Sequence, residues 1–328
     1  MSSYTELTLD RAPETIEDRP PRPAAYAGRE ETLTRVCADD LMEAFGLCRR
    51  WTGAPGVCKS RLRVLATRIL EPGCRLPAAR LARQISFYDE IVGERGLAAG
   101  GAWAVERLAR SLTVHGPEGV PEAGPVIVVS NHPGLGDSLA LFAALPRSDL
   151  RVIAAERAFL RALPNTSRYL IPVGGDPAGR PAGLGGLREA SRHLKRGGAI
   201  LTFPRGGIEP DPACMPGAEA SLEGWRRSLE LFLRLAPETT VIPAIVSGVI
   251  SPTALSSPAT RLRRLPEDQR WLAASLQMLV PALRDVHTEV RFGHPMRATG
   301  TAPGQSKAVL EEARRMIRAA GPGEPGEV

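Results

Sequence analysis

Short apolar runs alternate with segments of helical periodicity over the second part of the chain. Each run is four to eight residues long and rich in aliphatic residues, which is typical of a buried strand. This alternation predicts an α/β fold with a central, mostly parallel or mixed sheet of about seven strands flanked by helices. The predicted strands are Ser111–His115, Pro125–Ser130, Leu150–Ala154, Tyr169–Val173, Ala199–Phe203, Thr239–Val246 and Glu289–Phe292. The predicted helices cover 138–145, 156–163, 183–196, 219–235 and 267–280.

The segment before these strands has helical spacing throughout. Between about Glu30 and Ser111 the pattern predicts three or four helices, with a break at Pro72 and a helix start near Pro77. Both ends of the chain lack a periodic apolar pattern and are rich in charges, proline or glycine, which is typical of disorder. The predicted organisation is a disordered tail over 1–28, a helical arm over 29–110, an α/β domain over 111–320 and a disordered tail over 321–328.

The composition is that of a soluble globular protein with an excess of basic residues. Of the 328 residues, 43% are hydrophobic, and no apolar run reaches the ~18–20 residues that span a bilayer. The N-terminal sequence lacks the basic start and apolar core of a secretory signal, so we expect a cytoplasmic protein. The net charge of +6 favours an anionic partner: nucleic acid, a phosphorylated small molecule or an acidic membrane surface. An aromatic content of only 5% argues against nucleic acid, whose bases stack on aromatic faces.

The cysteines do not point to a disulfide or metal site. They are odd in number and form no CxxC pair. Small buried hydrophobes are the better interpretation of these side chains, and we expect neither disulfides nor zinc. The five residues are Cys37, Cys48, Cys58, Cys74 and Cys214.

One apolar run leads directly into polar, glycine-rich sequence: VIVVSNHPGLGDSLALFAAL, from Val126 to Leu145. A buried strand, a turn at the proline and glycines, and a helix capped by Asp137 account for every residue except His132. A histidine at this place is either a hydrogen-bonded residue of the strand end or a functional group. In α/β sheets, chemistry lies at the carboxyl ends of strands, which favours the second interpretation.

The spacing between His132 and Asp137 permits a catalytic dyad. Across a tight turn the carboxylate can reach one imidazole nitrogen, fix the tautomer and stabilise the imidazolium. The other nitrogen can then take a proton from a hydroxyl group. No protein nucleophile accompanies the pair, so the hydroxyl of a substrate would attack. Transfer of an acyl group from an activated thioester to an alcohol fits these requirements.

The stretch SNHPGLGD resembles the first motif of the phospholipid/glycerol acyltransferase family, which is Asn-His, four residues and Asp. Three further blocks follow in the order of that family. The third is usually Phe-Pro-Glu-Gly and here reads Phe203-Pro204-Arg205-Gly206, and the fourth, a short strand with proline, is VIPAIV with Pro243. The second block, YLIPVGGDPAGR, has glycines where the family has an arginine, and Arg180 follows later. The resemblance covers roughly residues 111–250.

The resemblance implies an O-acyltransferase of lipid metabolism, acting in phospholipid biosynthesis, with an α/β fold. The donor would be acyl-CoA or acyl-carrier protein, used as a co-substrate without a further cofactor or metal. The acceptor would be a glycerol phosphate or a lysophospholipid. By this resemblance His132 is the general base and Asp137 orients it. The residues that would bind substrate are Asn131, Arg180, Phe203, Pro204, Arg205, Gly206 and Pro243.

Arg205 is the clearest departure from the family pattern, because it reverses the charge of the usual glutamate. A guanidinium at this position can hold a phosphate through a bidentate contact, or it can be a solvated loop residue. Gly206 and Gly207 can bring backbone N–H groups close to an anion, or they can simply form a turn. Arg180 can replace the missing arginine or lie on the surface, and Glu209 can pair with a neighbouring arginine.

The helical arm is strongly basic. Nine lysine and arginine residues lie between Arg49 and Arg83, with Glu71 as the only acidic residue. They alternate with aliphatic residues, a composition found in interfacial helices and also in solvated helix faces. Each basic residue near an anionic membrane contributes up to ~1 kcal/mol. One interpretation of the arm is therefore a peripheral attachment to the inner face of the membrane, and the other is a solvated surface.

Two other functions remain open from the sequence. The string GDSL at residues 136–139 spells the signature of one serine-hydrolase family, in which Ser138 would be the nucleophile. A loop separates it from the strand, Asp285 and His287 have the wrong spacing for its partner motif, and no GxSxG elbow occurs. The altered second and third blocks also allow a catalytically inactive relative that binds lipid.

Overall fold

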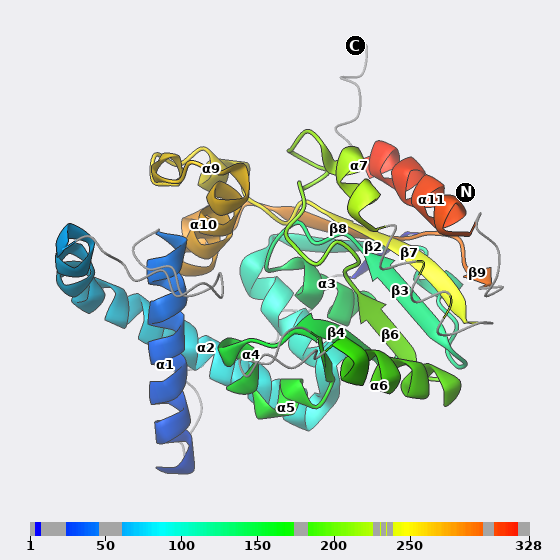
Figure 1. Ribbon diagram of the computed structural model, residues 1–328, viewed down its shortest axis with the longest axis horizontal. Helices are drawn as coiled ribbons and strands as arrows, with labels where there is room; N and C mark the ends of the chain where they lie inside the picture. Colours follow the sequence, from blue (N-terminus) through cyan, green and yellow to red (C-terminus); the bar gives the residue numbers. More distant parts are fainter. Residues whose placement is uncertain are drawn as a thin grey trace.

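A twisted sheet with helices on both faces forms the centre of the molecule (Figure 1). The computed structural model describes residues 4–7, 24–45, 61–173, 183–225, 230, 234, 239–297 and 305–320. The strand order is β1-β2-β8-β7-β3-β6-β4-β5, and β9 pairs with β7. Most neighbouring strands are parallel, whereas β1 with β2, β7 with β8 and β7 with β9 are antiparallel. The predicted α/β fold with a mostly parallel, mixed sheet is confirmed.

All seven predicted strands are present, within two residues of their predicted bounds. The central strands β3 and β6 are buried along their whole length, which explains why they appear in the sequence as uninterrupted apolar runs. The seven are β2 (Ser111–His115), β3 (Val126–Ser130), β4 (Arg151–Ala155), β5 (Leu170–Val173), β6 (Ala199–Thr202), β7 (Thr240–Ser247) and β8 (His287–Phe292).

Two short strands were not predicted, β1 (Tyr4–Leu7) and β9 (Met296–Arg297). The prediction of a disordered tail over 1–28 is wrong for β1 and for the start of α1 at Ala24. The sequence YTEL has no apolar run, and β1 is formed by antiparallel pairing with β2, which no local pattern reveals. The rest of this tail and residues 321–328 lie outside the described residues, so their disorder stays a prediction.

Two layers of helices cover the two faces of the sheet. One face packs against α2 (Arg61–Leu108) and α3 (Asp137–Ala144), the other against α6 (Gly183–Lys195) and α11 (Gln305–Ala320). Successive residues of β3 alternate between the two cores, as the pleat of a strand requires. The remaining elements are η2 (Pro117–Gly119), α4 (Ala158–Arg161), α5 (Pro164–Ser167), α7 (Ala218–Ser221), η3 (Leu222–Trp225), α9 (Pro252–Leu255), η4 (Thr260–Leu262), α10 (Pro266–Leu279) and η5 (Pro281–Leu283).

The predicted helical arm contains α1 (Ala24–Ala44) and α2. The expected break and helix start at Pro72 and Pro77 are wrong, because α2 continues through both and departs from helical geometry at Gly96, where φ is 85°. The second half of α2 packs so closely on α3 that a Cβ on Gly101 would lie 2.6 Å from a backbone oxygen of α3. The division of the chain into an arm and a domain stays a prediction. Among the described residues, no helix combines the length and apolar character needed to cross a membrane.

Candidate active site

The loop after β3 starts at the carboxyl end of the sheet, between β6 and β7. Asn131 fixes its direction. The side-chain nitrogen of this buried residue donates to the carbonyl of Val246, and its side-chain oxygen accepts from the N–H of Val246, both at 2.8 Å. Asn131 therefore ties the end of β3 to β7. Its predicted contact with substrate stays a prediction, and its placement favours a role in holding the loop.

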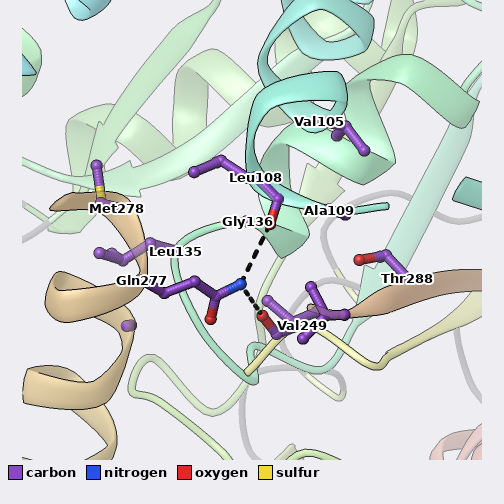
Figure 2. Close-up of a pocket in the computed structure, with 11 residues that line it drawn as sticks. Val105, Leu108, Ala109, Leu135, Gly136, Val249, Gln277, Met278 and Thr288 are labelled. Atoms are coloured by element: carbon purple, nitrogen blue, oxygen red, sulfur yellow. Dashed lines mark hydrogen bonds between the residues drawn. The ribbon is translucent and has the colours of Figure 1, made fainter. Parts of the chain in front are cut away.

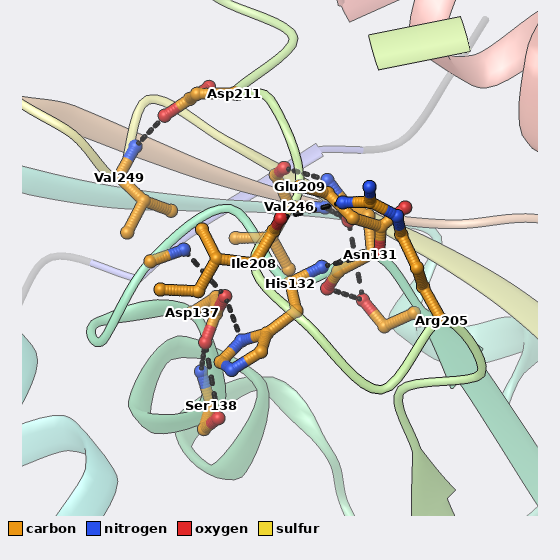
Figure 3. Close-up of polar contacts among 12 residues, drawn as sticks. Asn131, His132, Asp137, Ser138, Arg205, Ile208, Glu209, Asp211, Val246 and Val249 are labelled. Atoms are coloured by element: carbon orange, nitrogen blue, oxygen red, sulfur yellow. Dashed lines mark hydrogen bonds and ion pairs between the residues drawn. The ribbon is translucent and has the colours of Figure 1, made fainter. Parts of the chain in front are cut away.

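His132 and Asp137 lie together, as the motif spacing suggested. The Nδ1 atom of His132 is 2.7 Å from the Oδ2 atom of Asp137 (Figure 3). The carboxylate is fully buried and also accepts the N–H of Gly134 at 3.0 Å and the N–H and hydroxyl of Ser138. The carboxylate of Asp137 accepts a hydrogen bond from the imidazole proton on Nδ1 and leaves Nε2 as the basic nitrogen. The His132 side chain keeps 26% of its surface exposed.

The electrostatic surroundings favour the protonated form of His132. Burial lowers the pKa of the imidazole, and Arg157 adds to this effect. The charge and hydrogen bond of Asp137, with a further contribution from Glu209, outweigh both, so the pKa of His132 is raised above 6.5. Such an imidazole is a stronger base than a free one, which suits proton removal from an alcohol.

The third block lies beside His132 because it follows β6, the parallel neighbour of β3. The ring of Phe203 packs on the imidazole with the two ring centres 4.7 Å apart. The N–H of Gly206 donates to the carbonyl of Phe203 at 3.0 Å and closes a turn, and φ of Gly206 is 72°, a value that glycine adopts without strain. Pro204 is buried in this turn. The first and third blocks thus lie next to each other in the fold.

Arg205 lies at the exposed outer side of this turn. Its Nη1 atom donates to the carbonyl of Ile208 at 2.7 Å, and its stem lies over Gly224, where a Cβ would come within 3.1 Å of it. Arg270 of α10 lies close to it: burial lowers the pKa of Arg270, and the charge of Arg205 lowers it further. Figure 3 shows Arg205 on the side of His132 away from Asp137. A contact between Arg205 and phosphate stays a prediction.

Glu209 is a site residue that the sequence reasoning missed. One interpretation paired it with an arginine, but its carboxylate is fully buried and its hydrogen-bond partners are neutral donors. It accepts the backbone N–H of His132 at 3.1 Å, the hydroxyl of Ser221 at 2.9 Å and the indole N–H of Trp225 at 3.0 Å. Nothing in the local sequence indicates this, because His132 lies 77 residues away along the chain.

Arg157 was also missed. It follows β4 and affects the pKa of His132, which places its charge near the dyad. Burial lowers the pKa of Arg157 to about 10, while Asp40 and Glu43 of α1 oppose that effect. Its guanidinium carbon lies 6.0 Å from the ring centre of Trp271 on α10. A basic residue just after the strand β4 is the only sequence signal for it, and many surface loops share that feature.

Two predicted substrate-binding residues are placed away from the dyad or are not described. Pro243 lies inside β7, buried, paired in register with Val129 and packed on Gly293. Its carbonyl accepts the N–H of Gly293 at 2.8 Å, at the point where the antiparallel partner of β7 changes from β9 to β8. Proline has no backbone N–H to donate, but at this point no neighbouring strand needs one, so Pro243 interrupts no hydrogen bond of the sheet. Arg180 lies outside the described residues, and the substrate contacts of both stay predictions.

The surroundings of Ser138 do not resemble those of a hydrolase nucleophile. Its hydroxyl donates to the Oδ1 atom of Asp137 at 3.1 Å and so supports the dyad carboxylate. His287, the partner considered for it, lies at the start of β8 with its Nδ1 atom 2.8 Å from the hydroxyl of Ser111. A serine nucleophile needs a histidine base within hydrogen-bond reach. The arrangement therefore gives the esterase interpretation no support.

A small, mostly apolar hollow of about 20 Å³, open to solvent, lies beside the loop between β3 and α3, which we call the dyad loop. It is lined by residues of α2, the dyad loop, α10 and β8, among them Leu108, Leu135 and Met278 (Figure 2). Gln277 spans one side, donating to the carbonyls of Leu108 at 3.3 Å and Val249 at 3.0 Å. Leu135 and Gly136 of the dyad loop thus line an apolar space.

A family comparison decides which activity this site belongs to. The family described as Acyltransferase matches residues 111–247. They run from β2 to the end of β7 and include the dyad loop, the third-block turn and Pro243. This segment is an acyltransferase domain. The match confirms the family resemblance suggested by the motifs and makes the protein an O-acyltransferase.

Among solved structures, the chain is similar to the crystal structure of the 1-acyl-sn-glycerophosphate (LPA) acyltransferase PlsC from Thermotoga maritima. The identity is 17% and the TM-score 0.40, and the similarity covers 87% of this chain and 97% of that one. None of the curated proteins compared with the chain matches it. Within the part of the acyltransferase that the structure describes, no cluster of three or more His, Cys, Asp or Glu side chains has the arrangement of a metal site.

Proposed function

We propose that this acyltransferase moves a fatty acyl group from acyl-CoA or acyl-carrier protein to a hydroxyl of a glycerol phosphate or lysophospholipid, within phospholipid biosynthesis. The observation that carries the proposal is the 2.7 Å contact between His132 and Asp137 at the carboxyl edge of the sheet. An imidazole held on one side by a buried carboxylate can act as a general base through its other nitrogen. The family match at residues 111–247 supports acyl transfer as the reaction that uses this base.

The proposed reaction follows from the position of the free imidazole nitrogen. The Nε2 atom of His132 removes the proton of the acceptor hydroxyl while its oxygen attacks the thioester carbonyl and forms the new C–O bond. Asp137 stabilises the imidazolium that results. The tetrahedral intermediate then collapses with cleavage of the C–S bond, and the leaving thiolate takes the proton from His132. The products are an ester and a free thiol, and the base returns to its starting state.

Three arginines support an acceptor or donor that carries phosphate. Arg205 and Arg270 lie near one another beside the third-block turn, and Arg157 lies close enough to His132 to affect its pKa. A guanidinium binds phosphate through paired hydrogen bonds, and each charge-assisted bond contributes about 1.5–3 kcal/mol. We propose that these cations hold the phosphate of the acceptor or the phosphates of CoA while the hydroxyl approaches His132.

We also propose that the protein docks on an anionic membrane surface from the cytoplasmic side. Leu76 of α2 is exposed together with Arg75, Arg80 and Arg83, which gives this part of the arm both apolar and basic groups. The segment RLRRL at 261–265 repeats this combination, with Leu262 71% and Leu265 53% exposed. Exposed leucines flanked by basic residues are typical of interfacial segments.

The second segment contacts the arm, because Arg263 donates to the carbonyl of Glu43 at the end of α1, at 3.3 Å. We propose that both segments meet the membrane. Trp271 and Arg270 of α10, shortly after the second segment, lie near Arg157 and Arg205 of the site. Docking in this way would bring the site close to a lipid acceptor. The other basic residues counted in the arm have side chains outside the described residues, so their part in docking stays a prediction.

The experiment that tests the proposed function measures thiol release from an acyl-CoA with and without lysophosphatidic acid or glycerol 3-phosphate. Release that depends on the acceptor, with the acylated product seen by mass spectrometry, supports acyl transfer. Release at the same rate without an acceptor would identify a thioesterase. No release from acyl-CoA or from acyl-carrier protein with any acceptor would identify a binding relative and overturn the proposal.

A further inference from the structure

A second buried carboxylate holds the main chain of His132, whereas Asp137 holds its imidazole. Glu209 has none of its surface exposed, and its Oε2 atom accepts the backbone N–H of His132 at 3.1 Å. In return, the N–H of Glu209 donates to the carbonyl of His132 at 2.8 Å. Both backbone groups of His132 are thus bonded to one residue of the loop after β6. Such a double link fixes the position of the Cα from which the imidazole extends.

The other oxygen of Glu209 is anchored in the core. Oε1 accepts the indole N–H of Trp225 at 3.0 Å, and Trp225 is among the largest fully buried side chains of the described residues. The hydroxyl of Ser221 lies 2.9 Å from the same oxygen. The link therefore runs from His132 through one carboxylate to the segment of α7 and η3. A displacement of that carboxylate would be passed directly to the base.

The donors that surround the side chain of Glu209 require a carboxylate at this position. The N–H of His132 and the indole of Trp225 can only donate, and they point at different oxygens. A carboxylate accepts both bonds. A glutamine of the same shape has one acceptor oxygen, so its NH₂ group would face one of the two donors. A buried donor left without an acceptor costs about 1–3 kcal/mol.

The charge of Glu209 acts on the imidazole as well. Four charged side chains from different elements influence the pKa of His132 or of Glu209: Asp137 on α3, Glu209 itself, Arg157 after β4 and Arg205 in the third-block turn. Burial raises the pKa of Glu209, while the bonds from Trp225, Ser221 and His132 and the charge of Arg205 oppose this. Ionised Glu209 adds to Asp137 in favouring the imidazolium.

We propose that Glu209 is a positioning residue for the base: its buried carboxylate fixes the backbone of His132 and, with Asp137, stabilises the imidazolium. The inference rests on the proposed role of His132 as general base. Glu209 does not touch the reacting atoms, since its contacts are with the main chain of His132 and with the core. A misplacement of about 1 Å in a catalytic group can lower the rate by roughly 100-fold.

Asp211 provides a matched control two residues further along the same loop. It is also fully buried, and its carboxylate accepts the N–H groups of Gly248 at 2.9 Å, Val249 at 2.6 Å and Ile250 at 3.0 Å. It ties the loop after β6 to the loop after β7, and it is not among the groups that shift the pKa of His132. Asp211→Asn thus makes the same chemical change in the same loop without touching the base.

The test compares Glu209→Gln and Glu209→Ala with Asp211→Asn, by the pH dependence of acyl transfer and by NMR titration of the imidazoles. Both Glu209 variants are expected to lower kcat roughly 10- to 100-fold with less than about threefold change in KM, because positioning is lost and binding is not. The acid limb of the kcat profile and the NMR pKa of His132 are both expected to move to lower pH. Asp211→Asn is expected to lower the thermal midpoint without moving either pH value.

Some results would overturn the inference. Glu209 would be only a structural residue if the Glu209→Gln variant folds and keeps a wild-type kcat, or if NMR shows an unchanged pKa of His132. A shift of the same size in Asp211→Asn would lead to the same conclusion. His132→Ala distinguishes this outcome from a failure of the proposed function, because the variant removes the base itself and leaves Glu209 unchanged. If His132→Ala is inactive and Glu209→Gln behaves as wild type, His132 remains the general base and the positioning role of Glu209 is wrong.

Discussion

The two sides of His132 are built in opposite ways. On one side lie Asn131, Asp137 and Glu209, which are buried and have a hydrogen-bond partner for each side-chain oxygen. On the other lie Arg205, Gly206 and Gly207, all exposed, with Arg205 held by one bond to a carbonyl. The buried side fixes a geometry, and the exposed side leaves cations accessible to a ligand.

The difference matters because buried and exposed polar groups respond differently to substitution. A buried donor or acceptor that loses its partner costs about 1–3 kcal/mol, whereas exposed groups exchange a partner for water at little cost. Substitutions on the buried side should therefore change kcat and thermal stability. Substitutions on the exposed side should change KM and leave the fold intact.

The largest effect is expected for His132→Ala. Loss of the general base should lower kcat by roughly 10²–10⁴ in an assay of acceptor-dependent thiol release. The thermal midpoint should change little, because the side chain is partly exposed and its backbone bonds to Glu209 remain. A variant with near-normal transfer would remove His132 from the chemistry, and an unfolded variant would make the histidine structural.

Asp137→Asn should combine a loss of rate with a loss of stability. An amide can place the wrong tautomer of His132 in the site, an effect that reaches about 10⁴ in other catalytic histidines. It also presents an NH₂ group to the buried donors Gly134 and Ser138. We expect kcat to fall by roughly 100-fold or more, and a measurable drop in the urea midpoint. Wild-type stability together with wild-type kcat would contradict the account of the buried side.

Arg205→Glu tests the exposed side. If the guanidinium holds a phosphate, loss of one charge-assisted bond and added repulsion should raise KM for the phosphorylated substrate at least about tenfold. Arg205→Ala serves as the neutral comparison and should raise KM less. Assays with phosphorylated and unphosphorylated acceptors, at several acyl-CoA concentrations, identify which substrate is held. An unchanged KM for every donor and acceptor would leave Arg205 a surface residue.

The smallest effect is expected for the docking surface. Sedimentation with vesicles of anionic lipid should recover the protein at low salt, with recovery falling at ~0.5 M salt, where screening acts within a few ångströms. Leu262→Ser combined with Leu265→Ser should weaken recovery, since these side chains are exposed and can enter the interface. Equal binding to neutral vesicles, or recovery that the double variant leaves unchanged, would argue against a basic and apolar docking surface.

Much of the fold could be predicted from the sequence, because the strands of a mostly parallel sheet are buried and appear as apolar runs. VIVVS of β3 and TVIPAIVS of β7 are examples. The edge strand β1 and the two-residue β9 depend on pairing with distant segments and leave no such pattern. The helix α11 was missed even though Val309, Leu310 and Ala313 recur at helical spacing and are buried.

The candidate site could be predicted only where its residues are neighbours in the sequence. His132 and Asp137 lie five residues apart, so the motif alone brings them together. Glu209 and Arg157 reach the same histidine because β6 and β4 follow β3 across the sheet, and that order is a property of the fold. The hydrogen bonds of Asn131 to Val246, 115 residues away, likewise could not be inferred from the motif.

The central claim, that His132 is the general base, is tested most directly by titrating it in two independent ways. The chain has five histidines, so the imidazole signals can be followed by NMR, and His132→Ala identifies the one that belongs to the dyad. The raised pKa of His132 means that the base is protonated and inactive below that value, so kcat should rise as the pH increases through it. We predict that the NMR pKa lies above 6.5 and coincides with the acid limb of the kcat profile. An acid limb at a different pH, or one that persists with full activity in His132→Ala, would contradict the account.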